Sequence, residues 1–151
     1  MVRTKKIHEE TLLRSGYEFV LENGFDAISV RKLAKYMGYS TKPIYDEFIN
    51  LNNFKEALLN YVVTNVTNLI LKDSISSTSA FAEEIYLFAA TRPKEFTRFF
   101  LKDSKCKALI KKQLYIFFKE VIHDNKAKDI ERNFDTFWYY TLGKATDIAY
   151  N

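Results

Sequence analysis

The chain has 151 residues, a net charge of +4, a pI near 9.0, 47% hydrophobic residues and 28% charged residues. This is the composition of a soluble globular protein with one or two domains, and its positive charge favours an anionic partner. Only four glycines and two prolines are present, which favours long helices over strands and turns. The single cysteine excludes an internal disulfide, and no apolar run is long enough to span a membrane. The N-terminus lacks the apolar core of a signal peptide, so we expect a cytoplasmic protein. The scarcity of glycine and proline leads us to expect an all-α fold.

The chain begins with a basic segment and a long helix. Arg3, Lys5 and Lys6 precede or open this helix and could contact DNA phosphates or the minor groove. A frayed, solvated terminus is the alternative. The helix is predicted over residues 4–23, and Gly24 can end it.

Residues 28–48 predict two short helices joined by a tight turn. Val30, Leu33, Ala34 and Met37 form one apolar stripe at helical spacing, with Ser29 before it as a candidate N-cap. The glycine that follows the stripe can end the helix in a left-handed conformation. A second helix can begin at residue 40 or 41, because a proline in the first turn removes no helical hydrogen bond. Two such helices form a helix-turn-helix.

The charges of this segment favour DNA binding. Between residues 27 and 45 there are four basic residues and no acidic one. The second helix of a helix-turn-helix enters the major groove with its N-terminal residues at the base edges, and Thr41, Lys42 and Pro43 occupy that end. A helical corner inside another kind of all-α protein is the alternative.

Residues 12–59 resemble the DNA-binding domain of the TetR family of bacterial transcriptional regulators. The motif positions that carry the resemblance are Gly24-Phe25, Ser29-Val30, Leu33-Ala34, Gly38, Tyr39, Ser40, Ile44-Tyr45 and Phe48. The resemblance implies a three-helix helix-turn-helix domain over residues 1–51 and a helical ligand-binding and dimerisation domain over residues 52–151. We expect the DNA contacts to come from Lys5, Lys6, Ser29, Arg31, Ser40, Thr41, Lys42, Pro43, Tyr45 and Lys55.

Five further helical segments are predicted after the helix-turn-helix. Asn52 or Asn53 can cap a helix that extends to about residue 72, and the polar stretch 74–79 breaks the pattern. Helices follow over about 80–90, from residue 93 to about 101, over 106–122 and over 128–150.

The C-terminal helices carry many aromatic residues, which could line a small-molecule pocket. An ordinary aromatic core is the alternative. The candidate pocket residues are Phe81, Tyr86, Phe96, Phe100, Tyr115, Phe118 and Trp138. Residues 92–112 also carry eight basic residues against two acidic ones. A solvated helix face, an acidic ligand or partner, and auxiliary DNA contact remain open for this stretch.

We expect a homodimer, because a two-fold axis lets two recognition helices bind a palindromic operator. TetR-family members usually add one more helix to their dimer interface. Since this sequence stops at Asn151, we expect a shortened dimerisation domain. The candidate interface residues are Trp138, Thr141, Leu142, Ala145 and Ile148.

No arrangement of residues favours catalysis. The two histidines lack metal-site spacing, and Cys106 lies on an apolar helical stripe. We therefore expect no enzyme activity, no metal and no cofactor.

The resemblance to the TetR family predicts a DNA-binding repressor that a small-molecule inducer releases from its operator. The alternative is a helix-turn-helix protein that is regulated by a protein partner and has no small-molecule ligand.

Overall fold

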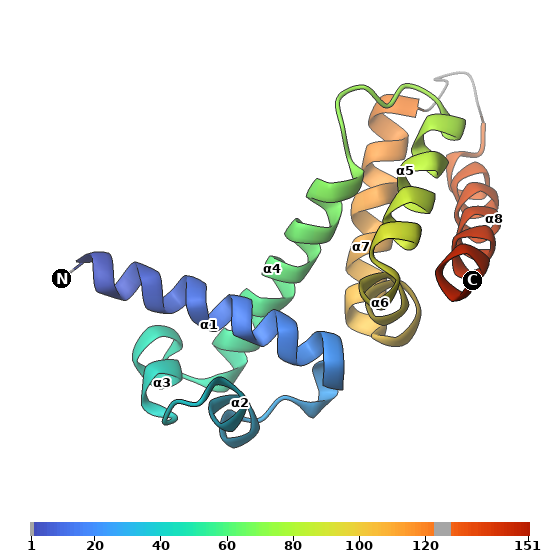
Figure 1. Cartoon of the computed structure of the whole chain (residues 1–151). Helices are drawn as coiled ribbons and strands as arrows, with labels where there is room; N and C mark the ends of the chain where they lie inside the picture. Colours follow the sequence, from blue (N-terminus) through green and yellow to red (C-terminus); the bar gives the residue numbers. More distant parts are fainter. Residues whose placement is uncertain (1, 123–127) are drawn as a thin grey trace. The chain divides into compact units, whose positions relative to one another are not determined.

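A computed structural model describes the backbone of residues 2–122 and 128–151, and the side chains of residues 9–122 and 128–151. Within these residues the chain forms eight α-helices and no strand (Figure 1). It divides into two compact units, residues 1–64 and 65–151, and the division falls inside the helix α4. The sequence places its domain boundary at the start of the same helix. No helix in the described part of the chain is long and apolar enough to cross a membrane.

The first unit contains α1 (Val2–Asn23), a 3₁₀ turn (Phe25–Ala27), α2 (Val30–Met37), α3 (Lys42–Phe48) and the first part of α4 (Leu51–Ile70). Both α2 and α3 pack on α1 (Figure 1). The core is built from one buried stripe of each helix, because apolar side chains at helical spacing share a face. Its members include Leu12, Phe19, Leu33, Ile44, Phe48, Phe54 and Leu58.

The second unit contains α5 (Thr78–Thr91), α6 (Pro93–Phe96), a π-helical segment (Thr97–Lys102), α7 (Ser104–Phe117), a second π-helical segment (Phe118–Ile122) and α8 (Ile130–Tyr150). Figure 1 shows α5, α7 and α8 side by side. Ring contacts join them: Phe81 of α5 lies 5.1 Å from Phe117 of α7 and 4.9 Å from Phe137 of α8, between ring centroids.

The helix ends test several of the sequence predictions. The N-cap role of Ser29 is confirmed, because its hydroxyl accepts a hydrogen bond from Lys32 N at 3.1 Å. The left-handed end at Gly38 is confirmed by a φ of 75°. The prediction that Asn52 or Asn53 caps α4 is wrong. Asn50 takes that place, since its Oδ1 accepts from Asn53 N at 2.9 Å and α4 already begins at Leu51.

Candidate nucleic-acid interface

The candidate interface is the surface that α2, the turn after it and α3 present to solvent. The helix α3 buries Ile44 and Phe48 fully against the first unit, and the Phe48 ring meets the Phe54 ring at a centroid distance of 5.0 Å. These two anchors fix which face of α3 points outward. On that outward face lie Lys42, which is exposed, and Tyr45, whose side chain is 49% exposed.

The predicted contact residues of the turn and of α3 lie next to one another. Ser40 and Lys42 are exposed, whereas Thr41 and Pro43 are half-buried at the start of α3. Thr41 has a helical φ of −74° and makes no side-chain capping bond, so its hydroxyl does not close the helix end. The start of α3 is therefore a small polar surface whose side chains are not used to cap the helix.

The basic residues of α2 lie beside this surface in the sequence and are also exposed. Arg31, Lys32 and Lys35 form no ion pair with any residue that the structure describes. Lys42 is likewise unpaired within the described residues. Unpaired ammonium and guanidinium groups remain available to phosphates.

A different part of α2 faces acidic residues. The Tyr36 ring packs edge-on against Phe19 of α1 at 5.4 Å between centroids. Burial raises the pKa of the Tyr36 phenol, and Glu22 and Glu18 of α1 raise it further. This side of α2 therefore lies next to acidic residues of α1.

Four other predicted contact residues lie outside this surface or outside the described side chains. The hydroxyl of Ser29 caps α2, and Lys55 is half-buried in the first turns of α4. Lys5 and Lys6 belong to α1, but their side chains lie outside the described residues.

The structure adds two exposed apolar side chains that the sequence did not single out as contacts. Tyr39 is 55% exposed and Ile49 is 76% exposed. Tyr39 follows directly on Gly38, in the turn between α2 and α3, so it belongs to no helix face that could bury it. Its position in this turn could have indicated its exposure from the sequence. Ile49 has a φ of 71°, which no sequence pattern indicates for a β-branched residue.

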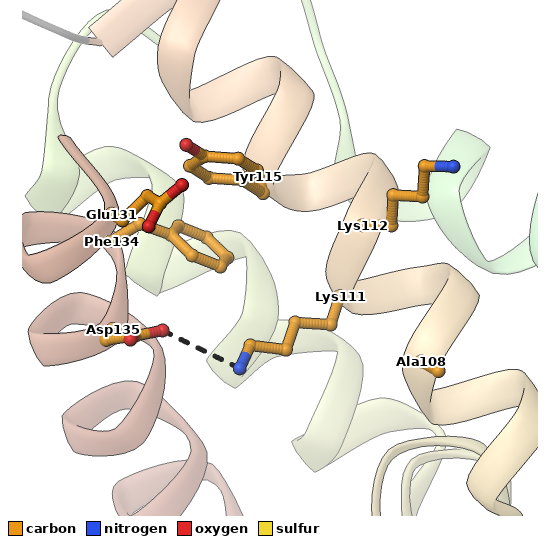
Figure 2. Close-up of a pocket in the computed structure, with 7 residues that line it drawn as sticks. All are labelled: Ala108, Lys111, Lys112, Tyr115, Glu131, Phe134 and Asp135. Atoms are coloured by element: carbon orange, nitrogen blue, oxygen red, sulfur yellow. Dashed lines mark ion pairs between the residues drawn. The ribbon is translucent and has the colours of Figure 1, made fainter.

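The predicted pocket residues of the second unit lie mainly in its interior. Phe81, Phe96, Phe100, Phe118 and Trp138 are buried and contact one another or neighbouring rings, for example Phe96 and Phe100 at 4.9 Å between centroids. Tyr86 is also buried and lines a groove between α5 and α8. Tyr115 is half-buried and lines a cavity between α7 and α8 (Figure 2).

The predicted dimer residues divide into two groups. Trp138, Thr141 and Ala145 are buried within the chain itself. Leu142 and Ile148 are half-buried. The large apolar side chains that α8 exposes are instead tyrosines, namely Tyr139, Tyr140 and Tyr150, with exposed fractions between 61% and 72%.

No group of three or more histidine, cysteine, aspartate or glutamate side chains that could hold a metal ion is present in the described part of the chain. Cys106 is buried, and burial together with the nearby Asp103 raises the pKa of its thiol to about 12. At neutral pH this sulfur is a protonated thiol rather than a thiolate nucleophile.

The chain matches no model of a known protein family, no curated protein and no solved structure. The resemblance to the TetR family therefore depends on the motif residues of the first unit alone.

Proposed function

We propose that the first unit is a helix-turn-helix DNA-binding domain and that the protein is a sequence-specific transcriptional regulator of the TetR kind. The observation that carries this proposal is the division of α3 into two faces. Ile44 and Phe48 anchor one face in the core, while Lys42 and Tyr45 lie exposed on the other. A short, firmly anchored helix with an exposed polar face is what a major groove admits.

The charge distribution supports the same proposal. The exposed cations of α2 and α3 are unpaired within the described residues, and no acidic residue lies between residues 27 and 45. In DNA recognition such cations supply the electrostatic part of the affinity, whereas base-edge contacts supply specificity. Ser40, Thr41, Lys42, Pro43 and Tyr45 are the proposed groove contacts.

We propose that the protein acts as a homodimer on a palindromic operator, with α8 in the interface. Gly143 supports this: it is exposed in the middle of α8, and a Cβ built on it would meet nothing within 4 Å. A glycine inside a helix destabilises it by about 1 kcal/mol relative to alanine, and packing within the protomer does not require one here. Its missing side chain leaves room for close approach of a second α8, and Tyr139 and Tyr150 lie on the same outward side at helical spacing.

The test is binding of the purified protein to DNA from the upstream region of its own gene, measured by fluorescence anisotropy at low salt. A scrambled duplex of equal length and composition is the control. Preferential binding of the upstream duplex supports the proposal. Equal binding of both duplexes contradicts sequence specificity, and no binding at low salt contradicts the DNA-binding assignment.

Release of the repressor by a small-molecule inducer is the proposed mode of regulation. An inducer acts only through its different affinity for the DNA-binding and the released states. The second candidate is regulation by a protein partner. It is favoured because most of the aromatic side chains that the sequence predicts for a pocket are buried in the core instead. A thermal-shift screen of metabolites distinguishes the two, because a ligand that binds the folded protein raises its melting temperature. Absence of any stabilising compound favours the partner.

A further inference from the structure

A cavity of about 300 Å³ lies between α7 and α8 in the second unit. Its lining residues are Ala108, Lys111, Lys112, Tyr115, Glu131, Phe134 and Asp135, as Figure 2 shows. The volume is at the lower end of the range for small-molecule sites, so it suits a ligand with a single ring. Of the predicted pocket residues, only Tyr115 belongs to this lining.

The apolar part of the lining is aromatic. The rings of Tyr115 and Phe134 lie 5.1 Å apart between centroids and are tilted by 48°. Ala108, on the same helix as Tyr115, contributes only a methyl group to the lining (Figure 2). Aromatic rings of this kind bind apolar bodies, and their faces also attract cations.

One of the rings already attracts a cation of the chain. The ammonium group of Lys119 lies 4.7 Å from the centroid of the Tyr115 ring. Lys119 itself is exposed and is not part of the lining. Its ammonium therefore already occupies one face of the Tyr115 ring.

The two lysines of the lining differ in their surroundings. Lys111 forms an ion pair with Asp135 at 3.6 Å, and its ammonium lies 5.0 Å from the centroid of the Tyr139 ring. Figure 2 shows the Lys112 side chain directed away from Tyr115 and Glu131. The charge of Lys111 is therefore balanced by Asp135, and that of Lys112 is turned outward.

Glu131 supplies the remaining charge of the lining. It lies in the first turn of α8 and forms no ion pair with a described residue. Glu131 and Asp135 also raise the pKa of the Tyr115 phenol, after the larger effect of burial, so their negative field reaches the aromatic wall.

We infer that this cavity binds a small organic cation, in which an ammonium group is joined to an aromatic or similarly apolar body. The ammonium pairs with the Glu131 carboxylate at the rim, and the apolar body lies against Tyr115 and Phe134. Opposite charge at Glu131 and the aromatic walls both select for this class of ligand. The inference does not depend on DNA binding.

The test is calorimetric titration of the full chain, without DNA, with three probes that share one ring. The probes are protonated 2-phenylethylamine, neutral 2-phenylethanol and anionic phenylacetate. We expect the ammonium probe to bind most tightly and phenylacetate most weakly. Undetectable binding of the ammonium probe, or equal or tighter binding of phenylacetate, would overturn the inference.

Variants locate the site. Glu131→Gln removes the charge but keeps the shape, and we expect it to weaken binding of the ammonium probe about tenfold or more. Glu83→Gln is the matched control, because Glu83 is exposed and lines the separate groove between α5 and α8. Ala108→Phe places a ring in the cavity from an exposed helix position and should abolish binding while the circular dichroism spectrum stays unchanged. Unchanged affinity of Glu131→Gln, or a larger loss in Glu83→Gln, contradicts the assignment.

Discussion

Gly16 of α1 and Phe54 of α4 approach each other so closely that a Cβ built on Gly16 would lie 2.9 Å from Cζ of Phe54. The two methyl groups of Leu58 would lie at 3.1 Å. Phe54 cannot move aside easily, because it is fully buried and its ring packs against Phe48. Glycine at position 16 therefore sets how closely α1 and α4 pack within the first unit.

Gly16→Ala should lower the free energy of unfolding by about 1–2 kcal/mol, because the cost of overpacking exceeds the gain in helix propensity. Urea denaturation followed by circular dichroism measures this. Gly143→Ala is the matched control and, in dilute protein, should raise stability by up to about 1 kcal/mol, since its Cβ would meet nothing. Equal or higher stability of Gly16→Ala would show that the close approach is not limiting.

Ile49→Gly should raise the free energy of unfolding by about 1 kcal/mol. Ile49 has a φ of 71° and forms a tight turn in which Asn50 N donates to the Phe48 carbonyl at 2.8 Å. A β-branched residue is strained there, and little packing is lost because the side chain is 76% exposed. Thermal denaturation compares it with Gly38→Ala, which places a Cβ at a φ of 75° and should be destabilised by about 1 kcal/mol. Destabilisation of Ile49→Gly would contradict the strain.

Lys42→Ala should weaken binding to the upstream duplex and reduce the slope of log affinity against log salt by about 1, if its ammonium neutralises one phosphate. Anisotropy titrations over a series of salt concentrations give the slope. The control is Lys128→Ala, which removes an exposed lysine of the second unit that lies outside the basic stretch 92–112. An unchanged slope in Lys42→Ala would remove the phosphate contact from the proposal.

Cys106 should react with a thiol reagent at pH 8 far more slowly in the native protein than in urea, because the thiol is buried and protonated.

The pKa of the Cys106 thiol rises from 9.0 to about 12 on folding, so above pH 9 the unfolded state releases this proton and the native state retains it. The stabilising effect of the neutral thiol is therefore complete below pH 9 and is lost as the pH rises towards 12. The stability difference between the wild type and Cys106→Ala should shrink over that range. A constant difference would contradict the raised pKa.

Gly143→Glu should shift the proposed dimer towards monomer. The new side chain has room within the protomer, but it would hold two α8 helices apart and place like charges near the two-fold axis. Sedimentation velocity at several protein concentrations measures the change, with Glu83→Gln as a control on α5. The same oligomeric state in Gly143→Glu and the wild type would exclude this face of α8 from the interface.

The helices of the first unit were largely predictable from the sequence, because their ends depend on local chemistry. Ser29 caps α2 through a hydrogen bond to a residue three positions away, and Gly38 ends it through its own backbone conformation. The stripe of Leu33 and Ala34 faces inward for the same local reason, the helical period. The prediction of the α4 cap was wrong because residues 50–53 contain three asparagines, and the sequence does not show which of them precedes the helix. The structure begins α4 at Leu51, so Asn50 is the cap.

The second unit shows what local pattern cannot supply. For the helix α8, the sequence predicts Trp138 both as a pocket residue and as a dimer-interface residue. The structure buries Trp138 and exposes Tyr139. The ion pair between Lys111 and Asp135 and the cavity beside it depend on the same packing of α7 against α8.

The sequence by itself determined an all-helical chain, the approximate extent of its helices and the basic, acid-free segment 27–45, because period, caps and charge are properties of neighbouring residues. Only the tertiary structure decided which aromatic side chains are core and which are surface, and where a cavity remains. These depend on how side chains distant in the sequence fill a shared volume, and no local pattern encodes that filling.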